Sequence, residues 1–491
     1  MEDLNVRKKN LIFFPLGTVG RDMVYCLVTN YLLTFILFTR SLSNGQLAAV
    51  TGIMVAARIF DGLNDPVMGN IIERTRTKWG KFKPWLLIGT LTSSVLIYIV
   101  FNTKLQGWSF IWLFGLFYFG YSITFTMCDI SYWGMVPALS SDADARNQFT
   151  SRATLFAGIG STLASILIPM LTTGTMALGG NTATAYGIIA LIIGLLSPAF
   201  VVFTLAGVRE NREDMKEAAP PVSFRKIVST ILGNDQLRWI SIAFLIQQIS
   251  NGIIIAGLGS TFIYIVYGYE GGLYSLFTTV GMMATAFLMI GYPAISRRIH
   301  RKDLMKIMIA VSMAGYVLML AAGLLMGSSK AGYWALVIGY MLSNFGQYCF
   351  YLIMMISIIN TVEYNELKTG SRDEAIITSL RPFITKVGSA VTAVVVSATY
   401  MIFGITSFTN GVSELENMAA SGTITEAEKL ARISEITAGM DHAKAVGLII
   451  VMTVIPAVLM NIAHYLYRRY YRLDEEEYDR ICREIAERKQ K

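Results

Sequence analysis

Long apolar runs separated by short polar stretches set the pattern of this chain. A run of about 20 apolar residues is the length that an α-helix needs to cross a bilayer core of about 30 Å. Twelve such runs occur, so the pattern predicts twelve transmembrane helices. Their expected ranges are 11–38, 46–71, 85–102, 109–136, 151–175, 183–208, 239–267, 272–296, 304–327, 331–362, 375–405 and 441–467.

The polar stretches divide these helices into two sets of six. The longest basic connection, residues 209–238, contains two prolines and follows the sixth run. We therefore predict an all-α polytopic membrane protein with an N-terminal six-helix bundle at 1–208, a cytoplasmic linker at 209–238 and a second, pseudo-symmetric six-helix bundle at 239–491. The second bundle is expected to include an extracellular loop at 406–440 and a cytoplasmic tail at 468–491. This outline resembles the major facilitator superfamily, in which substrate binds near the bilayer midplane.

Composition and charge agree with this class and exclude others. The 491 residues are 54% hydrophobic and 15% charged, too apolar for one soluble core of that length. Most of the 41 Lys and Arg residues fall in alternate connections, together with the two ends of the chain. That bias predicts that both termini are cytoplasmic and that the protein lies in the cell membrane. Orientation accounts for the net charge of +8, so we expect no nucleic-acid partner.

Cysteine and histidine give no sign of redox, metal or enzyme chemistry. The four cysteines are far apart, and the three histidines fall in loops or near the ends of runs. No nucleophile, metal cluster or histidine–carboxylate pair is expected to converge, so we predict that the protein is not an enzyme and needs no cofactor. The basic N-terminus precedes a run that is too long for a signal peptide, which indicates a retained first span.

The second span carries charged residues within the bilayer core, where each charge has a high free energy of insertion. Arg58, Asp61 and Asp65 recur at intervals of three and four residues, so they share one helical face that cannot face lipid. Two neighbouring carboxylates repel, which favours either a held proton or a bound cation. Asn64 and Thr126 of the fourth span could complete an oxygen shell for sodium. The alternative is a structural ion pair with Arg58, which would leave one carboxylate unexplained.

Single carboxylates in two other spans suggest a sugar site. Asp22 lies in the first span and Asp129 in the fourth, with Trp133 one turn further on. Carboxylates accept hydrogen bonds from sugar hydroxyls, and an aromatic ring packs against the apolar face of a sugar. Alternatively, Trp133 anchors the end of its span at the membrane interface.

Several stretches together carry a resemblance to a known family. They are "ARIFDGLNDPVMGNIIERTRTKWGKFKPW", "GRDM", "TMCDISYWGMVPAL", "RNQFTSRATLF" and "NTVEYNELKTGSRDEA", and they extend over most of the chain. The sequence resembles the glycoside–pentoside–hexuronide:cation symporter family of the major facilitator superfamily. The resemblance implies a cation-coupled symporter, driven by sodium, lithium or protons, that imports a sugar by alternating access.

The resemblance also implies which residues bind each ligand. The cation site would be Asp61, Asn64, Asp65 and Thr126, with Asp61 and Asp65 as the Na⁺ candidates. The sugar site would be Arg21, Asp22, Asp129, Trp133, Arg152 and Lys386.

The sequence departs from the pattern of the best-known family member at several positions, two of which bear on charge and stacking in the sugar site. Tyr351 stands where that member has a tryptophan, and Arg381 stands in place of a polar residue before the lysine. With Arg152 and Lys386, Arg381 suggests a cationic cavity suited to an acidic sugar. The alternative is that Arg381 neutralises Glu363 or another acid.

Other assignments stay open at this point. The implied partners are a small sugar, the coupling cation and the bilayer, and we expect a monomer. The alternative function is a lysolipid-type or other non-sugar carrier of the same superfamily. The polar segment Glu414–Ala445 predicts a helix starting at Thr425, either a solvated outer helix or a lid. The loop "RTRTKWGKFKPW" either contacts the inner end of span four or five or only sets topology.

Overall fold

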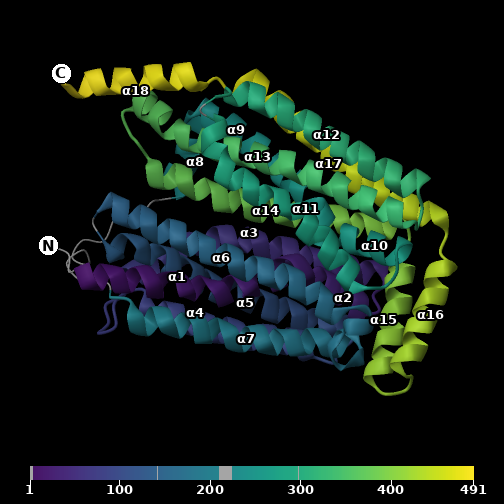
Figure 1. The fold of residues 1–491 in the computed structure, drawn as a ribbon. Coiled ribbons are helices and arrows are strands. Elements are labelled where there is room, and N and C mark those ends of the chain that lie inside the picture. Colours follow the sequence, from purple (N-terminus) through teal and green to yellow (C-terminus); the bar gives the residue numbers. More distant parts are fainter. Residues whose placement is uncertain (1–3, 141, 210–223, 297, 491) are drawn as a thin grey trace. The chain divides into compact units, whose positions relative to one another are not determined.

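A computed structural model describes residues 4–140, 142–209, 224–296 and 298–490, and the described chain is built of helices (Figure 1). Within these described ranges, eleven helices are long and apolar enough to cross a membrane. A twelfth span forms if the two parts of the bent helix α3 (Asn44–Arg74) are counted together. The polytopic all-α fold with about twelve spans is therefore confirmed. Residues 210–223, most of the first half of the expected linker, lie outside the described residues.

Contacts divide the chain into two compact units that do not follow chain order. Each unit takes most of one half of the sequence, but two segments from the second half pack within the first unit. The first unit comprises Met1–Pro221, Gly268–Leu276 and Tyr400–Met440, and the second comprises Val222–Tyr267, Phe277–Thr399 and Asp441–Lys491.

The first unit contains the helices of the N-terminal half and a helical hairpin from near the end of the chain. Its elements are α1 (Leu4–Cys26), η1 (Leu27–Tyr31), α2 (Leu32–Thr39), α3, α4 (Lys83–Asn102), α5 (Gly107–Leu139), α6 (Ala143–Thr172), η2 (Gly174–Met176), η3 (Leu178–Gly180), α7 (Thr182–Gly207), α15 (Thr406–Ala420) and α16 (Glu426–Ala438).

The second unit contains the remaining spans and two short amphipathic helices. Its elements are α8 (Phe224–Gly233), α9 (Asp235–Ile253), η5 (Ile254–Leu258), α10 (Gly259–Val266), most of α11 (Gly271–Ser296), α12 (Arg301–Leu325), α13 (Lys330–Thr369), α14 (Glu374–Ile402), α17 (His442–Tyr470) and α18 (Glu475–Gln490).

The first span of each half is interrupted in the same way. A π-helical segment, η1, joins α1 to α2, and a second one, η5, joins α9 to α10. A π-segment inserts one extra residue into a helix and occurs often at functional sites. The matched interruptions are a structural sign that the two halves are repeats, as the two sets of six apolar runs predicted.

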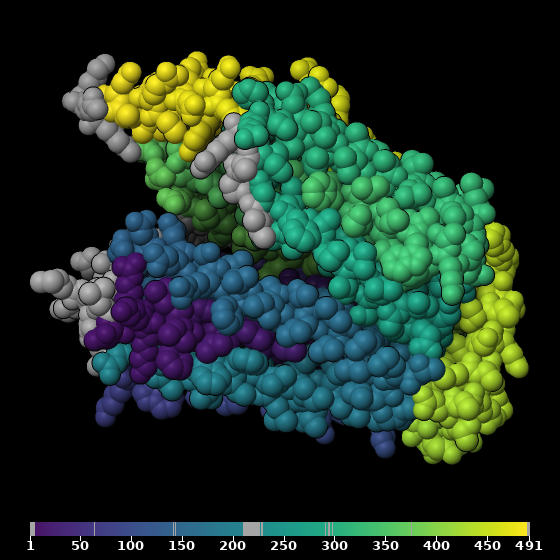
Figure 2. Space-filling view, viewed as in Figure 1, coloured from purple at the N-terminus to yellow at the C-terminus, as the bar shows by residue number. Residues whose placement is uncertain are grey.

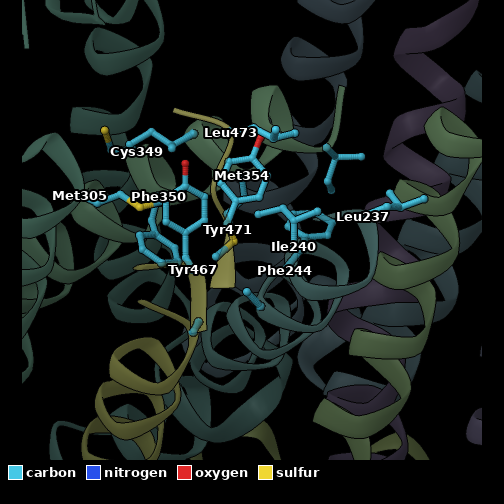
Figure 3. Packing of buried hydrophobic residues seen from close by; sticks show 14 of the residues in the cluster. Leu237, Ile240, Phe244, Met305, Cys349, Phe350, Met354, Tyr467, Tyr471 and Leu473 are labelled. Carbon is cyan, nitrogen blue, oxygen red and sulfur yellow. The ribbon is translucent and has the colours of Figure 1, made fainter. Parts of the chain in front are cut away.

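Helices pack closely because small residues and aromatic side chains meet between them. Between lipid-facing helices there is little hydrophobic driving force, so dispersion and close approach hold a bundle together. A Cβ at Gly315 of α12 would collide with the α13 backbone at Gly339, so only glycine permits this approach. Figure 3 shows a dense core in the second unit, in which Phe350 and Met354 of α13 lie near Tyr467 and Tyr471.

The α15–α16 hairpin packs within the first unit, although the order of spans had assigned residues 406–440 to the second half. Figure 2 shows the hairpin, in yellow-green, covering one end of the blue α6–α7 region. Asn410 holds the backbone of Leu42 through two hydrogen bonds of 2.9 Å, and Asn417 donates to the carbonyl of Thr39. The predicted helix start is confirmed, because the Thr425 side chain accepts from the backbone N–H of Glu428.

A buried ion pair joins this hairpin to the start of α7. Glu416 of α15 and Lys429 of α16 are fully buried and 3.4 Å apart. Glu416 accepts from the backbone N–H of Thr182 at 2.7 Å, and Lys429 donates to the carbonyl of Gly180 at 2.7 Å. Lys429 therefore anchors one face of α16 inside the unit, while most other residues of that helix are exposed, as in the solvated outer helix considered above.

The basic loop after α3 contacts two spans. Phe82 packs against Gly134 of α5, which is the expected contact with span four. Lys83 donates to the carbonyls of Leu205 and Val208 at 2.8 and 2.7 Å, at the end of α7. A cation at a helix C-terminus satisfies carbonyls that lack partners within the helix. This loop therefore has a structural role besides its charge.

Candidate functional site

The paired carboxylates of α3 face two hydroxyls of α5. Ser122 donates to Asp61, which is 3% exposed, and Thr126 donates to Asp65 at 3.0 Å. The carboxylates are four residues apart on α3 and the hydroxyls are four residues apart on α5, so the contacts form two rungs, one turn apart. The structure therefore brings three of the four expected cation ligands together, with a hydroxyl at Ser122 that we had not expected.

Arg58 makes an ion pair with Asp61, the first of the two carboxylates. Its guanidinium lies 3.4 Å from Asp61, and it also interacts electrostatically with the phenols of Tyr25, Tyr118 and Tyr121. Asp65 accepts a hydrogen bond from the neutral hydroxyl of Thr126. The structural ion pair considered as an alternative is thus present at Asp61.

Further oxygen ligands are available beside these carboxylates. The Asn64 side-chain nitrogen is buried and makes no hydrogen bond within the described residues. Turning the amide over would present its oxygen instead. Pro66 has no N–H, so the Gly62 carbonyl lacks its helical bond, and α3 bends by 43° next to Gly62. Two carboxylates, two hydroxyls, an amide and this carbonyl fit the oxygen preference of a hard cation.

Arg21 links the two carboxylates expected to bind sugar. It donates to Asp22 at 2.7 and 3.0 Å and to Asp129 at 2.8 Å. The guanidinium also lies over the rings of Tyr132 and Trp133, 5.0 and 5.2 Å from their centroids. One planar cation therefore holds α1 and α5 together and orients four of the expected sugar-binding residues, counting itself.

The two carboxylates differ in their exposure to solvent. The Asp22 side chain is 16% exposed and the Asp129 side chain is 44% exposed, while Arg21 is 5% exposed. Asp129 is therefore the acceptor that an entering hydroxyl can reach more easily. Asp22 serves mainly to hold the guanidinium in place.

Arg152 is not joined to this cluster. It extends from α6 and donates to the carbonyl of Leu11 at 3.4 Å. Leu11 precedes Arg21 by ten residues on α1, about 15 Å along the helix axis. This offset cannot be predicted from local sequence patterns, because it depends on how α6 is staggered against α1.

In the second unit, two of the expected residues meet. Arg381 of α14 donates to the phenol oxygen of Tyr351 on α13 at 3.0 Å. Glu363 instead pairs with Arg372 at 2.8 Å, so the alternative in which Arg381 neutralises Glu363 is wrong. Arg372 lies in the turn after α13 and reaches back to that helix. Lys386 is half-buried on α14, five residues after Arg381.

Charged side chains that pair with one another inside membrane spans are typical of secondary membrane transporters. Comparisons with known proteins agree. A family model described as "MFS/sugar transport protein" matches residues 13–475. The chain belongs to this family of transporters and is a multi-pass membrane protein.

Two curated relatives and one solved structure define the similarity further. Lactose permease from Lactobacillus helveticus is 30% identical over 80% of this chain and 62% of its own length. Raffinose carrier protein from Pediococcus pentosaceus is 27% identical over 96% of this chain and 71% of its own length. This chain thus spans less than two thirds of the length of the lactose permease.

The solved structure is a bacterial homologue of the human lysosomal transporter Spinster, in an inward-facing and occupied conformation. It aligns with a TM-score of 0.60 and 15% identity, over 95% of this chain and 96% of its own. This likeness supports the fold alone.

Proposed function

We propose that the protein is a cation:sugar symporter that imports a glycoside, pentoside or hexuronide across the cell membrane. The observation that carries the proposal is the two-rung contact of Asp61 and Asp65 with Ser122 and Thr126. Two carboxylates one helical turn apart within a membrane span repel each other, which favours a bound cation or a proton between them. The names of the relatives, lactose permease and raffinose carrier protein, support a sugar as the transported molecule.

The proposed coupling follows from the shared helix α5. Asp61 and Asp65 contact α5 at Ser122 and Thr126, and the Arg21 cluster contacts the same helix at Asp129. A cation that fixes α3 against α5 thereby fixes Asp129, which raises the affinity for sugar. Thermodynamic linkage requires that sugar raises the affinity for the cation by the same factor.

Transport in membrane vesicles tests the cation site. Asp65→Asn removes the carboxylate that accepts from Thr126, so cation-driven sugar accumulation should be lost while equilibrium exchange of sugar remains. The matched control is Glu435→Gln, which removes an exposed carboxylate on α16 and should leave accumulation unchanged. Full accumulation by the Asp65→Asn protein under a sodium gradient and under a proton gradient would show that the cation site lies elsewhere.

Arg381 is the residue that we expect to decide whether the protein prefers an acidic or a neutral sugar. Arg381 donates to the neutral phenol of Tyr351, and no carboxylate pairs with it among the described residues. The available positive charge favours an acidic sugar over a neutral one. Competition by glucuronides but not by neutral glycosides is expected, and the opposite result would assign a neutral glycoside.

A further inference from the structure

A groove runs along the outer surface of the second unit between α12 and α17. It has a volume of about 530 Å³. Its walls are apolar and come from Met313, Val317 and Leu320 of α12 and from Val454, Ala457 and Val458 of α17. None of these residues belongs to the proposed cation or sugar sites.

The groove lies on a surface suited to contact with lipid. Both helices are strongly apolar over the segments that could span the membrane. Val317 is 66% exposed and Val458 is 51% exposed. Exposed apolar side chains on a membrane-spanning helix contact the hydrocarbon chains of the bilayer.

One end of the groove is polar and basic. Asn461 and Tyr465 line that end, and Tyr465 is 61% exposed. Arg468 follows one turn later, and Lys306 lies at the start of α12. Both cations lie close enough to His464 to act on it electrostatically, which places them at the same end.

The acidic groups nearby only partly compensate these charges. Asp303 pairs with Lys306 at 2.7 Å and also interacts with Arg468. Glu475 and Asp474 pair with Arg301 and Lys302. Arg468 has no ion-pair partner among the described residues, so positive charge remains at the end of the groove.

We propose that this groove binds one acyl chain of an anionic phospholipid, with its phosphate held by Arg468 and assisted by Lys306. From Val454 to Tyr465 the groove follows eleven residues, about 16 Å of helix, which matches the roughly 15 Å depth of one leaflet. A basic side chain at the membrane surface attracts anionic headgroups. In this arrangement Tyr465 and Asn461 lie between the acyl chain and the phosphate, at the depth of the lipid's ester groups.

Native mass spectrometry of the full chain in detergent tests the site. The probes are palmitoyl-oleoyl phosphatidylglycerol and the matching phosphatidylcholine, titrated separately. The wild-type protein should retain one phosphatidylglycerol molecule about five-fold more tightly than phosphatidylcholine, the effect of about one uncompensated basic residue. Equal retention of both lipids would overturn the headgroup assignment.

Two pairs of variants test the binding of the acyl chain and of the headgroup separately. Ala457→Phe fills the groove and should abolish retention of that lipid, whereas Ala314→Phe, at an exposed position of α12 that does not line the groove, should not. Arg468→Gln should equalise the two lipids, whereas Arg483→Gln on α18 should not. Equal lipid retention by the Ala457→Phe and Ala314→Phe variants would overturn the proposal. So would wild-type protein dimers that Ala457→Phe disrupts. Neither readout depends on transport.

Discussion

Arg21 shows how one side chain can organise a site at the residue scale. Its guanidinium bonds two carboxylates and covers two aromatic rings, so it fixes positions on α1 and α5 at once. The carboxylates would otherwise repel each other in a medium of low dielectric. In the proposed sugar site, Asp129 would therefore be positioned by the Arg21 side chain, which need not touch the sugar itself.

Removal of this cation should cost stability as well as binding. Arg21→Gln leaves Asp22 and Asp129 without their shared partner, and we expect a loss of about 3 kcal/mol, at the lower end for buried pairs because Asp129 is partly exposed. Thermal unfolding of the detergent-solubilised protein measures this. Arg21→Lys keeps the charge but not the planar fork, so it should lose about half as much. A melting temperature of Arg21→Gln equal to that of the wild-type protein would contradict the bridging role.

The candidate site could be predicted from the sequence only where local spacing carried the information. Asp61, Asn64 and Asp65 share a face at helical intervals, and that pattern is visible in the chain. The spacing of Ser122 and Thr126 matches that of the carboxylates, a signal that was present but not used. In contrast, the bond from Arg21 to Asp129 joins residues 108 positions apart, and no local pattern encodes it.

At the scale of elements, the α15–α16 hairpin depends on a buried ion pair. Glu416 and Lys429 also satisfy the backbone at Thr182 and Gly180, so the hairpin holds the connection into α7. The cap at Thr425 could be predicted from the sequence, but the partners of the hairpin lie more than 200 residues earlier. The sequence pattern was therefore enough to predict the helix, but not the segment against which it packs.

Breaking this pair should destabilise the protein much more than breaking an exposed pair on the same helix. Lys429→Met leaves a buried carboxylate uncompensated, which costs about 3–5 kcal/mol. The matched control is Arg432→Met, whose partner Glu428 is 43% exposed, and its cost should stay below about 1 kcal/mol. Thermal unfolding compares the two variants, and similar melting temperatures would contradict burial of the pair. The double variant Lys429→Met with Glu416→Leu should recover part of the loss.

The start of α18 is tied to the start of α12 by carboxylates whose stabilising effect depends on pH. Burial alone would raise the pKa of Glu475, but bonds from the backbone and guanidinium of Arg301 hold its pKa below the usual value. The pKa of Asp474 is lowered in the same way by Lys302. Because the folded pKa values are depressed, the stabilisation is complete above the ordinary carboxyl pKa and is lost as the pH falls through the lower, folded values.

Melting temperatures measured from pH 6 to pH 3 should reveal this dependence. The wild-type protein should lose stability on acidification, and Glu475→Gln should lose less because part of the effect is already absent. Glu487→Gln, on the far part of α18, serves as the control and should follow the wild-type curve. Identical pH profiles for Glu475→Gln and the control would contradict the role of this carboxylate.

At the scale of the whole molecule, repetition and rearrangement coexist. The six-plus-six pattern and the matched π-segments η1 and η5 indicate two repeats, and apolar periodicity was enough to predict them. The compact units nevertheless do not coincide with the two halves of the chain, because Gly268–Leu276 and Tyr400–Met440 of the second half pack with the first unit. Periodicity records which residues are buried in lipid or protein, but it does not record against which helix they are buried.

The hairpin also gives the chain a place where it could be cut. Its two helices meet at an exposed turn, where Gly422 has a positive φ of 73° and open space around it. Cleavage there would leave α17 and α18 on a separate fragment, with Lys429 on that fragment and Glu416 on the other. The buried ion pair would then act as a non-covalent joint between two polypeptides, and co-purification of the fragments would measure its strength directly.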